Sequence, residues 1–418
     1  MVEGRNIRPR KALYISYNGL TEPIVRSQVI PYLAGLSKKG NRFCLITYEK
    51  KRLTRIEKDD LRADLKERVG SASAIRWFPL RYHKRPTVPA TVFDIGLGFF
   101  CSFYIILRYG IDIVHARAIV AAMAGYPASK LLGKKFIFDT RGIDSEEYVD
   151  AGSWRRGGLK HRFVGWAERI ISNGSDYVVV LTRRFLDILK KDRRLHLKAV
   201  SVIPCAVDTS LFTFFDKKDP ERSLKAGLNN NFVFVYSGSL GTWYMFDEML
   251  ELFKTAKSMV KNARLLILTQ TDVGFVERAL KKASLDPADV VIKTVGYAEM
   301  KDHLAMADVG ISFIKPVFSK LSSSPVKFGE YLACGLPVLI NRDIGDTDNM
   351  VRAEKIGAVV NGFEISEYER ALGELLGLMK DPGLRIRCRK SAEKYLSLDS
   401  AVEEYENIYE GLSCGLKK

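Results

Sequence analysis

The sequence predicts an α/β protein made of two doubly wound domains in tandem, and three observations carry this prediction. Short apolar segments alternate with helical patterns along both halves of the chain. A chain of 418 residues is too long for one ordinary core and suits two domains of roughly 150–200 residues. A polar, Pro- and Asn-rich stretch at 216–231 reads as the connection between them.

In the first half, a strand over 12–17 is followed by the loop "NGLTEP" and a helical pattern that ends at Gly40. The next strand covers 43–48. Further strands are expected at 112–116, 135–139 and 176–182, with a helix of small residues around 120–132. Strand, loop, helix and strand in this order form the repeating unit of a doubly wound sheet.

The second half repeats the pattern after a strand and Pro turn in "SVIPCAVDTSLF", 201–212. A strand running into a Gly-rich turn covers 232–241, and later strands are expected at 264–269, 289–296, 308–314 and 337–341. The tail at 400–412 has apolar residues at helical spacing, so one face of it should pack against the protein.

Charge is distributed unevenly along the chain. Residues 1–200 hold 38 Lys and Arg against 19 Asp and Glu, whereas the remainder holds 28 against 30. The first half should therefore face an anionic partner: nucleic acid, a membrane surface or a phosphorylated substrate. Its basic residues are not interleaved with aromatic residues in a nucleic-acid-binding motif, which argues against the first of these.

Neither a metal site nor a membrane span is expected. The six Cys and five His are scattered, with no CxxC pair and no His at metal spacing. The polar start "MVEGRNIRPR" does not resemble a secretory signal. The longest uncharged apolar run, Ile95–Leu107, has 13 residues, fewer than the roughly 20 needed to cross a bilayer.

The stretch "SSSPVKFGEYLACGLPVLIN", 322–341, is the strongest candidate site. Pro325 suits the first turn of a helix with Ser323 or Ser324 as N-cap, and a helix N-terminus attracts phosphate. Lys327 adds a full positive charge, and Glu330, about one turn on, could accept hydrogen bonds from a ribose diol. The alternative is an ordinary capped helix whose Lys and Glu face solvent.

Two loops should lie at equivalent positions in the two domains, beyond the carboxyl ends of strands, where ligands bind in open α/β sheets. In "YSGSLGTWY", 236–244, Gly238 and Gly241 let the backbone approach a ligand and Ser239 could donate to a phosphate, although such a turn alone is weak evidence. The loop Asn18–Leu20 occupies the corresponding place in the first half, with Arg26 just inside the next helix.

Two more groups of polar residues follow strands of the basic half. Asp139 and Arg141 lead an acidic cluster in "FDTRGIDSEEYVD", 138–150, and a solvated loop would look the same. His115 also follows a strand, where a lone His is more often structural. The sequence contains no Ser-His-Asp arrangement that can be justified, no Walker loop and no HExxH.

Four segments resemble the retaining glycosyltransferases of the family-4 type, with the GT-B fold. They are "NGLTEPIVRSQVIPYLAGLSKKG", "VIPCAVDTSLF", "VYSGSLG" and "SPVKFGEYLACGLPV". The resemblance implies two Rossmann-like domains facing a cleft: an acceptor-binding domain over 1–205 and a nucleotide-sugar-binding domain over 206–390. A C-terminal helix over 391–418 would pack back toward the first domain.

The resemblance also implies roles for individual residues. Glu330 would hold the nucleotide ribose. The remaining donor-binding residues would be Ser323, Ser324, Val326, Lys327, Gly238, Ser239 and Gly19. Residues on the acceptor side would be Asn18, Arg26, Asp139 and Arg141, and the catalytic residues would be Arg141, Lys327 and His115.

The sequence departs from the family pattern at its cations. Ser322 stands where the family commonly has a first Glu, and Ser239 and Tyr244 stand where it commonly has the Arg and Lys that grip the diphosphate. Arg141 stands in place of the usual His. The cationic clamp must therefore be rebuilt, with Lys327, Arg26 or Arg141 as candidates.

The activity implied is transfer of a hexosyl-type sugar from a nucleotide-diphosphate sugar, with retention, in cell-surface polysaccharide or glycan synthesis. Cations and helix N–H groups would stabilise the leaving diphosphate, whose oxygen would take the acceptor proton. No metal and no cofactor beyond the donor are expected. The "DIGDTDN" run, 343–349, is interpreted as an acidic loop that could touch the donor sugar.

The acceptor is expected to be a saccharide or a lipid-linked saccharide. The protein is expected in the cytoplasm, in peripheral contact with the anionic cytoplasmic face of the membrane, and 92–107 could dip into that interface. A buried core helix is the alternative for this segment. The competing functions are a nucleotide-sugar epimerase of the same fold and a non-catalytic protein that binds nucleotides or nucleic acid.

Overall fold

The computed structural model describes residues 9–70 and 74–414, which form two compact units. Unit 1 contains the described residues up to Leu181, then Phe185–Ile203, and those from Leu398 onward. Unit 2 contains Thr182–Arg184 and Pro204–Ser397. Each unit has its own sheet with helices on both faces, so the predicted pair of doubly wound α/β units is confirmed.

Unit 1 is built on a seven-stranded sheet with the order β3-β2-β1-β4-β5-β6-β7. All neighbouring strands are parallel. The order reverses between β1 and β4, so the carboxyl ends of these two strands mark the switch point where such sheets bind ligands. The strands are β1 (Lys11–Ser16), β2 (Arg42–Glu49), β3 (Ile75–Arg81), β4 (Ile113–Arg117), β5 (Lys135–Asp139), β6 (Tyr177–Val180) and β7 (Val200–Val202).

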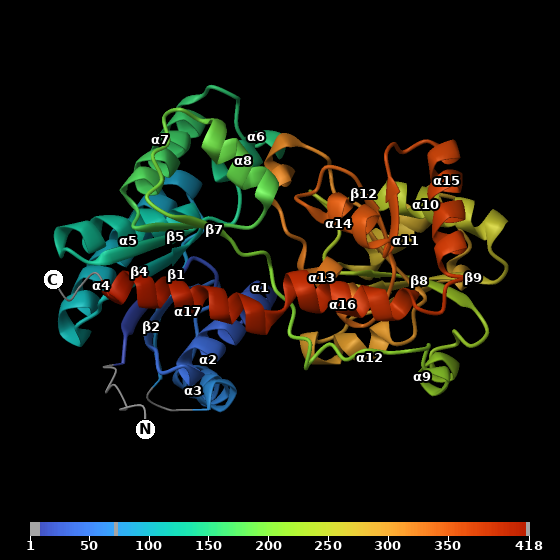
Figure 1. The fold of residues 1–418 in the computed structure, drawn as a ribbon, viewed down its shortest axis with the longest axis horizontal. Coiled ribbons are helices and arrows are strands. Elements are labelled where there is room, and N and C mark those ends of the chain that lie inside the picture. Colours follow the sequence, from blue (N-terminus) through green and yellow to red (C-terminus); the bar gives the residue numbers. More distant parts are fainter. Residues whose placement is uncertain (1–8, 71–73, 415–418) are drawn as a thin grey trace. The chain divides into compact units, whose positions relative to one another are not determined.

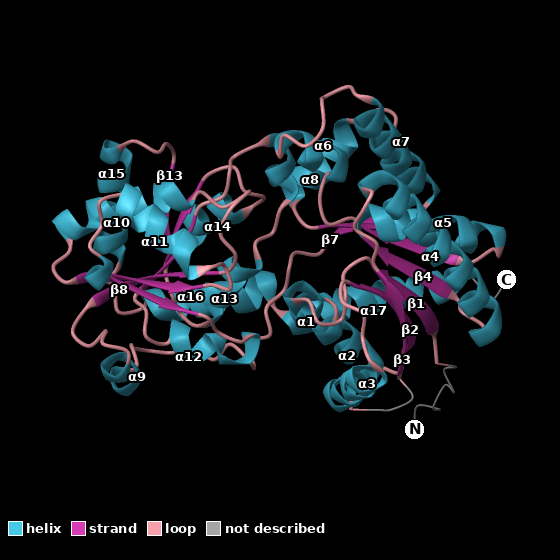
Figure 2. Ribbon diagram, turned by 180° about the vertical axis from the view of Figure 1, so that it is seen from behind, coloured by secondary structure: helices cyan, strands magenta, loops and turns pink. Residues whose placement is uncertain are grey.

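Helices cover both faces of this sheet (Figures 1 and 2). One face carries α1 (Pro23–Gln28), α2 (Ile30–Lys38), α3 (Arg55–Val69) and α17 (Leu398–Cys414). The other carries α4 (Thr87–Tyr109), α5 (Ala118–Leu131) and α7 (Leu159–Gly174), whose apolar side chains share one core with β1, β4 and β5. The remaining helices are α6 (Asp144–Asp150) and α8 (Arg183–Lys191).

The last helix, α17, belongs to unit 1 although it ends the chain. It runs along α2 (Figure 1), and Gly35 of α2 permits this approach because a Cβ there would lie 2.6 Å from a methyl carbon of Val402. The carboxylate of Glu406 pairs with Arg10 and accepts a hydrogen bond from Asn41. The crossing helix begins at Leu398 rather than at the predicted position 391, since residues up to Leu396 belong to the preceding helix of unit 2.

Unit 2 is built on a six-stranded parallel sheet with the order β10-β9-β8-β11-β12-β13. Its switch point lies between β8 and β11. The strands are β8 (Phe232–Ser237), β9 (Ala263–Leu268), β10 (Val290–Lys293), β11 (Val309–Ser312), β12 (Val338–Asn341) and β13 (Gly357–Val360).

Helices lie on both faces of this second sheet (Figure 2), and each set closes one of two apolar cores. One is closed by α10 (Phe246–Met259), α11 (Val273–Lys282) and α15 (Ile365–Leu378). The other is closed by α12 (Met300–Leu304), α13 (Val326–Ala333), α14 (Thr347–Glu354) and α16 (Leu384–Leu396). The short helix α9 (Pro220–Lys225) and the 3₁₀ turns η1 (Pro287–Asp289), η2 (Tyr297–Glu299) and η3 (Phe318–Ser322) complete the unit.

The helix α4 is longer than the uncharged apolar run of the sequence. It has 23 residues and a mean hydropathy of 1.9, so by length and composition alone it could cross a membrane. The helix begins before the uncharged run and includes Asp94. The carboxylate of Asp94 is buried, and it accepts hydrogen bonds from Tyr17 at 2.9 Å and from the backbone N–H of His83 at 3.0 Å. These partners allow a charged residue to lie inside this apolar helix. Only 33% of the apolar window is buried in the protein, so α4 packs one face on the core of unit 1 and leaves another face exposed.

Candidate active site

The helix α13 carries the predicted signature and starts without a serine cap. Pro325 itself occupies the N-cap position. The hydroxyl of Ser324 instead accepts a hydrogen bond from the backbone N–H of Cys205 at 3.1 Å, which fixes the segment after β7 against this helix. Ser323 and Val326 lie within two residues of Pro325 in the sequence and are half-buried. The prediction that a serine caps this helix was therefore wrong, although the helix begins where the sequence placed it.

Lys327 is buried rather than facing solvent. Its ammonium nitrogen lies 3.0 Å from the phenol oxygen of Tyr236, and it lies over the rings of Tyr236 and Tyr244 at 4.1 and 3.7 Å from their centres. Burial lowers the pKa of Lys327 well below its ordinary value, against the opposing charge of Glu330. The ammonium group is therefore kept away from water, and an arriving anion would favour its charged form.

The Gly-rich turn after β8 lies against this ammonium. Gly238 has φ +123°, and a Cβ at this position would lie 2.9 Å from Nζ of Lys327. The turn is held from both sides, because the backbone N–H of Ser237 donates to the hydroxyl of Tyr331 at 2.8 Å and the hydroxyl of Tyr236 donates to the carbonyl of Ser239 at 2.5 Å. Ser239 itself is exposed. Only glycine satisfies both the backbone conformation and the close approach.

Glu330 lies one turn further along α13 and is also buried, with 6% of its surface exposed. Burial raises the pKa of its carboxyl to about 7, although the charge of Lys327 and a hydrogen bond from Tyr297 oppose the shift. A buried carboxyl that titrates near neutrality is typical of functional sites.

A second buried cation, Lys320 in η3, was missed by the sequence reasoning. Its ammonium lies 3.7 Å from the ring centre of Trp243, and only 6% of the residue is exposed. Lys320 and Lys327 thus both lie against aromatic rings of the segment 236–244. The sequence offered one signal, a Lys two residues before the Ser322 that replaces the family's Glu. The hydroxyl of Ser322 donates to the carbonyl of Ser319 at 2.6 Å.

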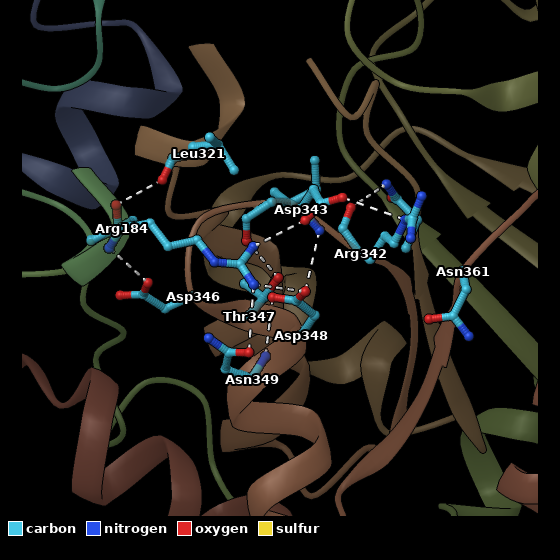
Figure 3. A network of polar contacts seen from close by, with 12 residues as sticks. Arg184, Leu321, Arg342, Asp343, Asp346, Thr347, Asp348, Asn349 and Asn361 are labelled. Carbon is cyan, nitrogen blue, oxygen red and sulfur yellow. Dashed lines mark hydrogen bonds and ion pairs between the residues drawn. The ribbon is translucent and has the colours of Figure 1, made fainter. Parts of the chain in front are cut away.

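The carboxylates of the acidic run 343–349 have polar partners within unit 2 (Figure 3). The guanidinium of Arg184 lies 3.0 Å from the buried carboxylate of Asp348 and 3.5 Å from that of Asp343. The carboxylate of Asp346 accepts the backbone N–H groups of Arg183 and Arg184 at 2.6 and 3.2 Å. Within residues 9–70 and 74–414, no cluster of three His, Cys, Asp or Glu side chains could hold a metal ion.

In unit 1, the loop after β1 is tied to two carboxylates that the sequence reasoning did not single out. The side chain of Glu22 accepts the backbone N–H of Gly19 at 2.7 Å and the amide of Asn18 at 3.2 Å. The buried Glu49 at the end of β2 accepts the N–H of Leu20 at 2.8 Å, and a Cβ on Gly19 would lie 2.7 Å from its oxygen. A glycine is needed at position 19 because the carboxylate of Glu49 lies so close to its backbone. The expected contact between Gly19 and the donor stays a prediction.

The other residues predicted for unit 1 lie in two places. His115 and Asp139 are buried side by side, with Nε2 and a carboxylate oxygen 3.6 Å apart, and Nδ1 of His115 lies 2.8 Å from the hydroxyl of Tyr409 in α17. Arg141 lies 3.1 Å from the second oxygen of Asp139. Arg26 instead faces α3, where it pairs with Asp64 at 3.6 Å.

Burial and the neighbouring arginines set the charges of His115 and Asp139. Burial lowers the pKa of His115, which favours the neutral ring. Burial alone would raise the pKa of Asp139, but Arg141, His115 and Arg117 hold it well below its usual range. The contact with α17 favours a structural role for His115, and its catalytic role stays a prediction.

Comparison with known proteins gives the family. Residues 32–211 match the model of "Glycosyltransferase Family 4" and residues 218–395 match that of "Glycosyl transferases group 1", so the two together span most of the chain. No curated protein matches the chain.

Three solved structures illustrate the likeness of fold. A glycosyltransferase from Rickettsia africae is 15% identical with a TM-score of 0.72, over 98% of this chain and 100% of that one. Anabaena HepE in complex with UDP and glucose is 13% identical with a TM-score of 0.67, over 97% and 100%. WaaG, a glycosyltransferase involved in lipopolysaccharide biosynthesis, is 14% identical with a TM-score of 0.66, over 96% and 100%. The chain therefore belongs to the family-4 retaining glycosyltransferases, which use nucleotide-sugar donors, and it has the GT-B fold.

Proposed function

We propose that Lys327, Lys320 and Glu330 bind the nucleotide diphosphate of the donor in unit 2. The observation that carries this proposal is the buried ammonium of Lys327 against Gly238 at the switch point of the sheet. Its neighbours among the described residues are the hydroxyl and ring of Tyr236, the ring of Tyr244 and the turn at Gly238, none of which carries a negative charge. A diphosphate is the ligand whose charge, oxygen atoms and size suit two lysines beside a helix N-terminus.

The chemistry follows from this placement. As the bond between the sugar and the diphosphate breaks, negative charge grows on the phosphate oxygens, and buried cations stabilise it more strongly than water does. The leaving phosphate oxygen would take the proton of the acceptor hydroxyl on the face that it leaves, which gives retention. Glu330 would accept hydrogen bonds from the ribose hydroxyls and so fix the position of the nucleoside.

The acceptor proposed is a saccharide or lipid-linked saccharide of a cell-surface glycan, used at the cytoplasmic face of the membrane. The excess of positive charge in residues 1–200 and the exposed apolar part of α4 support this setting. Uridine is the first base to test, because HepE was solved in complex with UDP-glucose.

Transfer to a lipid extract is the test. The protein is incubated with radiolabelled UDP-glucose, UDP-galactose or GDP-mannose and membrane lipids, and labelled lipid and released nucleotide are measured together. The proposal predicts equal amounts of labelled lipid and released nucleotide with one of the donors. Both products should be lost in Lys327→Met but not in the surface control Lys261→Met. Conversion of the donor to its epimer without acceptor would contradict it in favour of an epimerase.

A further inference from the structure

A buried arginine at the carboxyl end of β4 has no counter-ion among the described residues. Arg117 is the last residue of β4, and 7% of it is exposed. Its Nε is buried without a hydrogen-bond acceptor, and no carboxylate within residues 9–70 and 74–414 lies at ion-pair distance from its guanidinium. A guanidinium keeps its charge at any ordinary pH, so its burial without a counter-ion is unfavourable. A group of this kind in a folded protein calls for an explanation beyond packing.

Arg117 lies at the switch point of the first sheet. It is in register with Ser16 on β1 and with Asp139 on β5, and each of these three residues ends its strand. Open α/β sheets bind their ligands beyond these carboxyl ends. The sequence analysis singled out the neighbours of Arg117 but not Arg117 itself. The cation without a counter-ion therefore lies where this kind of sheet binds a ligand.

The carboxylate of Asp139 does not neutralise Arg117. It lies 3.1 Å from the guanidinium of Arg141 and 3.6 Å from Nε2 of His115. Arg117 is near enough to help lower the pKa of Asp139 but forms no ion pair with it. Burial lowers the pKa of His115, so its ring is favoured in the neutral form. Two guanidinium groups and one carboxylate therefore leave one positive charge without compensation, which an anionic ligand would balance.

The helix that covers this face of the sheet supplies no negative charge to Arg117. Residues 115 and 117 point to the same face because side chains alternate along a strand, and α17 lies against that face through Tyr409, whose hydroxyl is 2.8 Å from Nδ1 of His115. Burial raises the pKa of Tyr409 well above its ordinary value, so its hydroxyl stays neutral. The carboxylate of Glu406 on the same helix is paired with Arg10.

The backbone that follows Arg117 also favours an anion. Ala118 has φ +66°, in the left-handed region that is unfavourable for alanine, and the 14-residue helix α5 begins at this residue. Arg117 occupies the N-cap position of α5, and its side chain makes no capping hydrogen bond. The N-terminus of a helix carries a partial positive charge on its first N–H groups. The carboxyl end of β4 therefore offers positive charge from the backbone as well as from the side chain.

We propose that Arg117 binds an anionic group, a phosphate or a carboxylate, on the saccharide that accepts the sugar. A guanidinium suits both groups, since it donates two parallel hydrogen bonds to a pair of their oxygen atoms. The acceptor is the substrate chosen because the residues predicted for the acceptor side, Asn18, Asp139 and Arg141, follow or end strands of the same sheet. The proposal rests on the transferase function proposed above and narrows its acceptor to an anionic saccharide.

Binding of small anionic sugars to the full chain tests the proposal without catalysis. Glucose 6-phosphate, glucuronate and neutral glucose are titrated by calorimetry into Lys327→Met, which lacks the cation proposed for the donor diphosphate. We expect one of the two anionic sugars to bind, which distinguishes phosphate from carboxylate, and glucose not to bind. Adding Arg117→Met should lower that affinity by about tenfold or more, whereas Arg117→Lys, which keeps the charge, should retain part of it. The control Arg193→Met removes an exposed arginine of unit 1 and should leave the affinity unchanged.

Transfer assays then separate the acceptor from the donor, and circular dichroism melting confirms that each variant is folded. In Arg117→Met the KM for the acceptor should rise about tenfold or more, while the affinity for the nucleotide stays that of the wild type. Failure of both anionic sugars to bind, equal binding with and without Arg117, or a loss of nucleotide affinity in Arg117→Met would overturn the proposal and leave the donor site in place. Binding of an anionic sugar that requires Arg117, in a protein that transfers no sugar, would support the anion site and contradict the transferase function instead.

Discussion

Gly238 lies directly against the side chain of Lys327, since a Cβ at position 238 would lie 2.9 Å from the ammonium nitrogen of residue 327. The turn after β8 and the first turn of α13 therefore approach each other as closely as a glycine permits. A ligand that reaches the backbone of this turn also reaches the buried cation, which makes this pair the centre of the candidate donor site.

Replacement of Gly238 by Ala should weaken donor binding more than it weakens the fold. Gly241 gives a matched control, since it too has positive φ, at +108°, but has open space around a Cβ. Both variants should lose about 1 kcal/mol of stability from backbone strain. Only Gly238→Ala should lose tenfold or more in nucleotide affinity by calorimetry. Equal losses of affinity would show that the contact with Lys327 is irrelevant.

Lys327→Met should raise the melting temperature of the ligand-free protein while it abolishes donor binding. A buried ammonium without a carboxylate in ion-pair contact is unfavourable, and methionine replaces it with a similar apolar shape. We expect a gain of about 1–3 kcal/mol in unfolding free energy by denaturant titration. Nucleotide affinity should fall by about a hundredfold, as for loss of a buried charged contact. A variant that binds the nucleotide as the wild type does would remove Lys327 from the site.

Binding of the diphosphate should be accompanied by proton uptake. Burial lowers the pKa of Lys327 in the free protein, and an adjacent phosphate would raise it again. Calorimetry in two buffers of different ionisation enthalpy measures the protons exchanged. Uptake at alkaline pH that disappears in Lys327→Met is expected, and the same uptake in both proteins would contradict the assignment.

Lys320 should contribute to the same ligand as a second cation. Lys320→Met is expected to weaken nucleotide affinity about tenfold, whereas Lys320→Arg, which keeps the charge over Trp243, should retain most of it. Transfer assays at several donor concentrations separate KM from kcat. If both variants bind the donor equally well, Lys320 serves only the packing of η3.

The stability of the protein should depend on the titration of Glu330. Its pKa is raised to about 7, whereas an unfolded chain titrates near its ordinary 4.5, so the native state holds more protons between these values. The free energy of unfolding should therefore fall, by about 3 kcal/mol, as the pH rises from about 4.5 to about 7, and then level off. Denaturant titration of the wild type minus Glu330→Gln isolates this contribution. A difference that does not change with pH would mean that the carboxyl has an ordinary pKa.

Loss of the buried carboxylate of Asp348 should destabilise the protein more than loss of the neighbouring carboxylate of Asp343. Asp348→Asn leaves Arg184 with a weakened partner in a buried place and should cost about 1–3 kcal/mol. Asp343→Asn alters a half-exposed partner of the same arginine and should change stability by less than about 0.5 kcal/mol. Thermal melting compares the two, and an equal effect would show that burial does not strengthen the Arg184–Asp348 pair.

The sequence predicted the two doubly wound units because strand and helix periodicities are local properties of the chain. It also placed α13 and the turn at Gly238 correctly, since Pro325 and the glycines punctuate their own elements. The length of α4 was missed because Asp94 reads as a break, whereas its partners Tyr17 and His83 come from elsewhere in the chain. Lys320 and Glu49 were missed for the same reason, since their partners Trp243 and Leu20 are distant in sequence.

Nucleotide binding by the wild type and by Glu330→Ala tests the central claim most directly. UDP, GDP, ADP and CMP are titrated by calorimetry and by thermal shift, where a ligand at a hundred times its dissociation constant stabilises by about 2.7 kcal/mol. The account predicts that one nucleoside diphosphate binds the wild type and that Glu330→Ala, still folded, loses this binding. Equal binding by both proteins, or no binding of any nucleotide to the wild type, would contradict a donor site at Lys327 and Glu330.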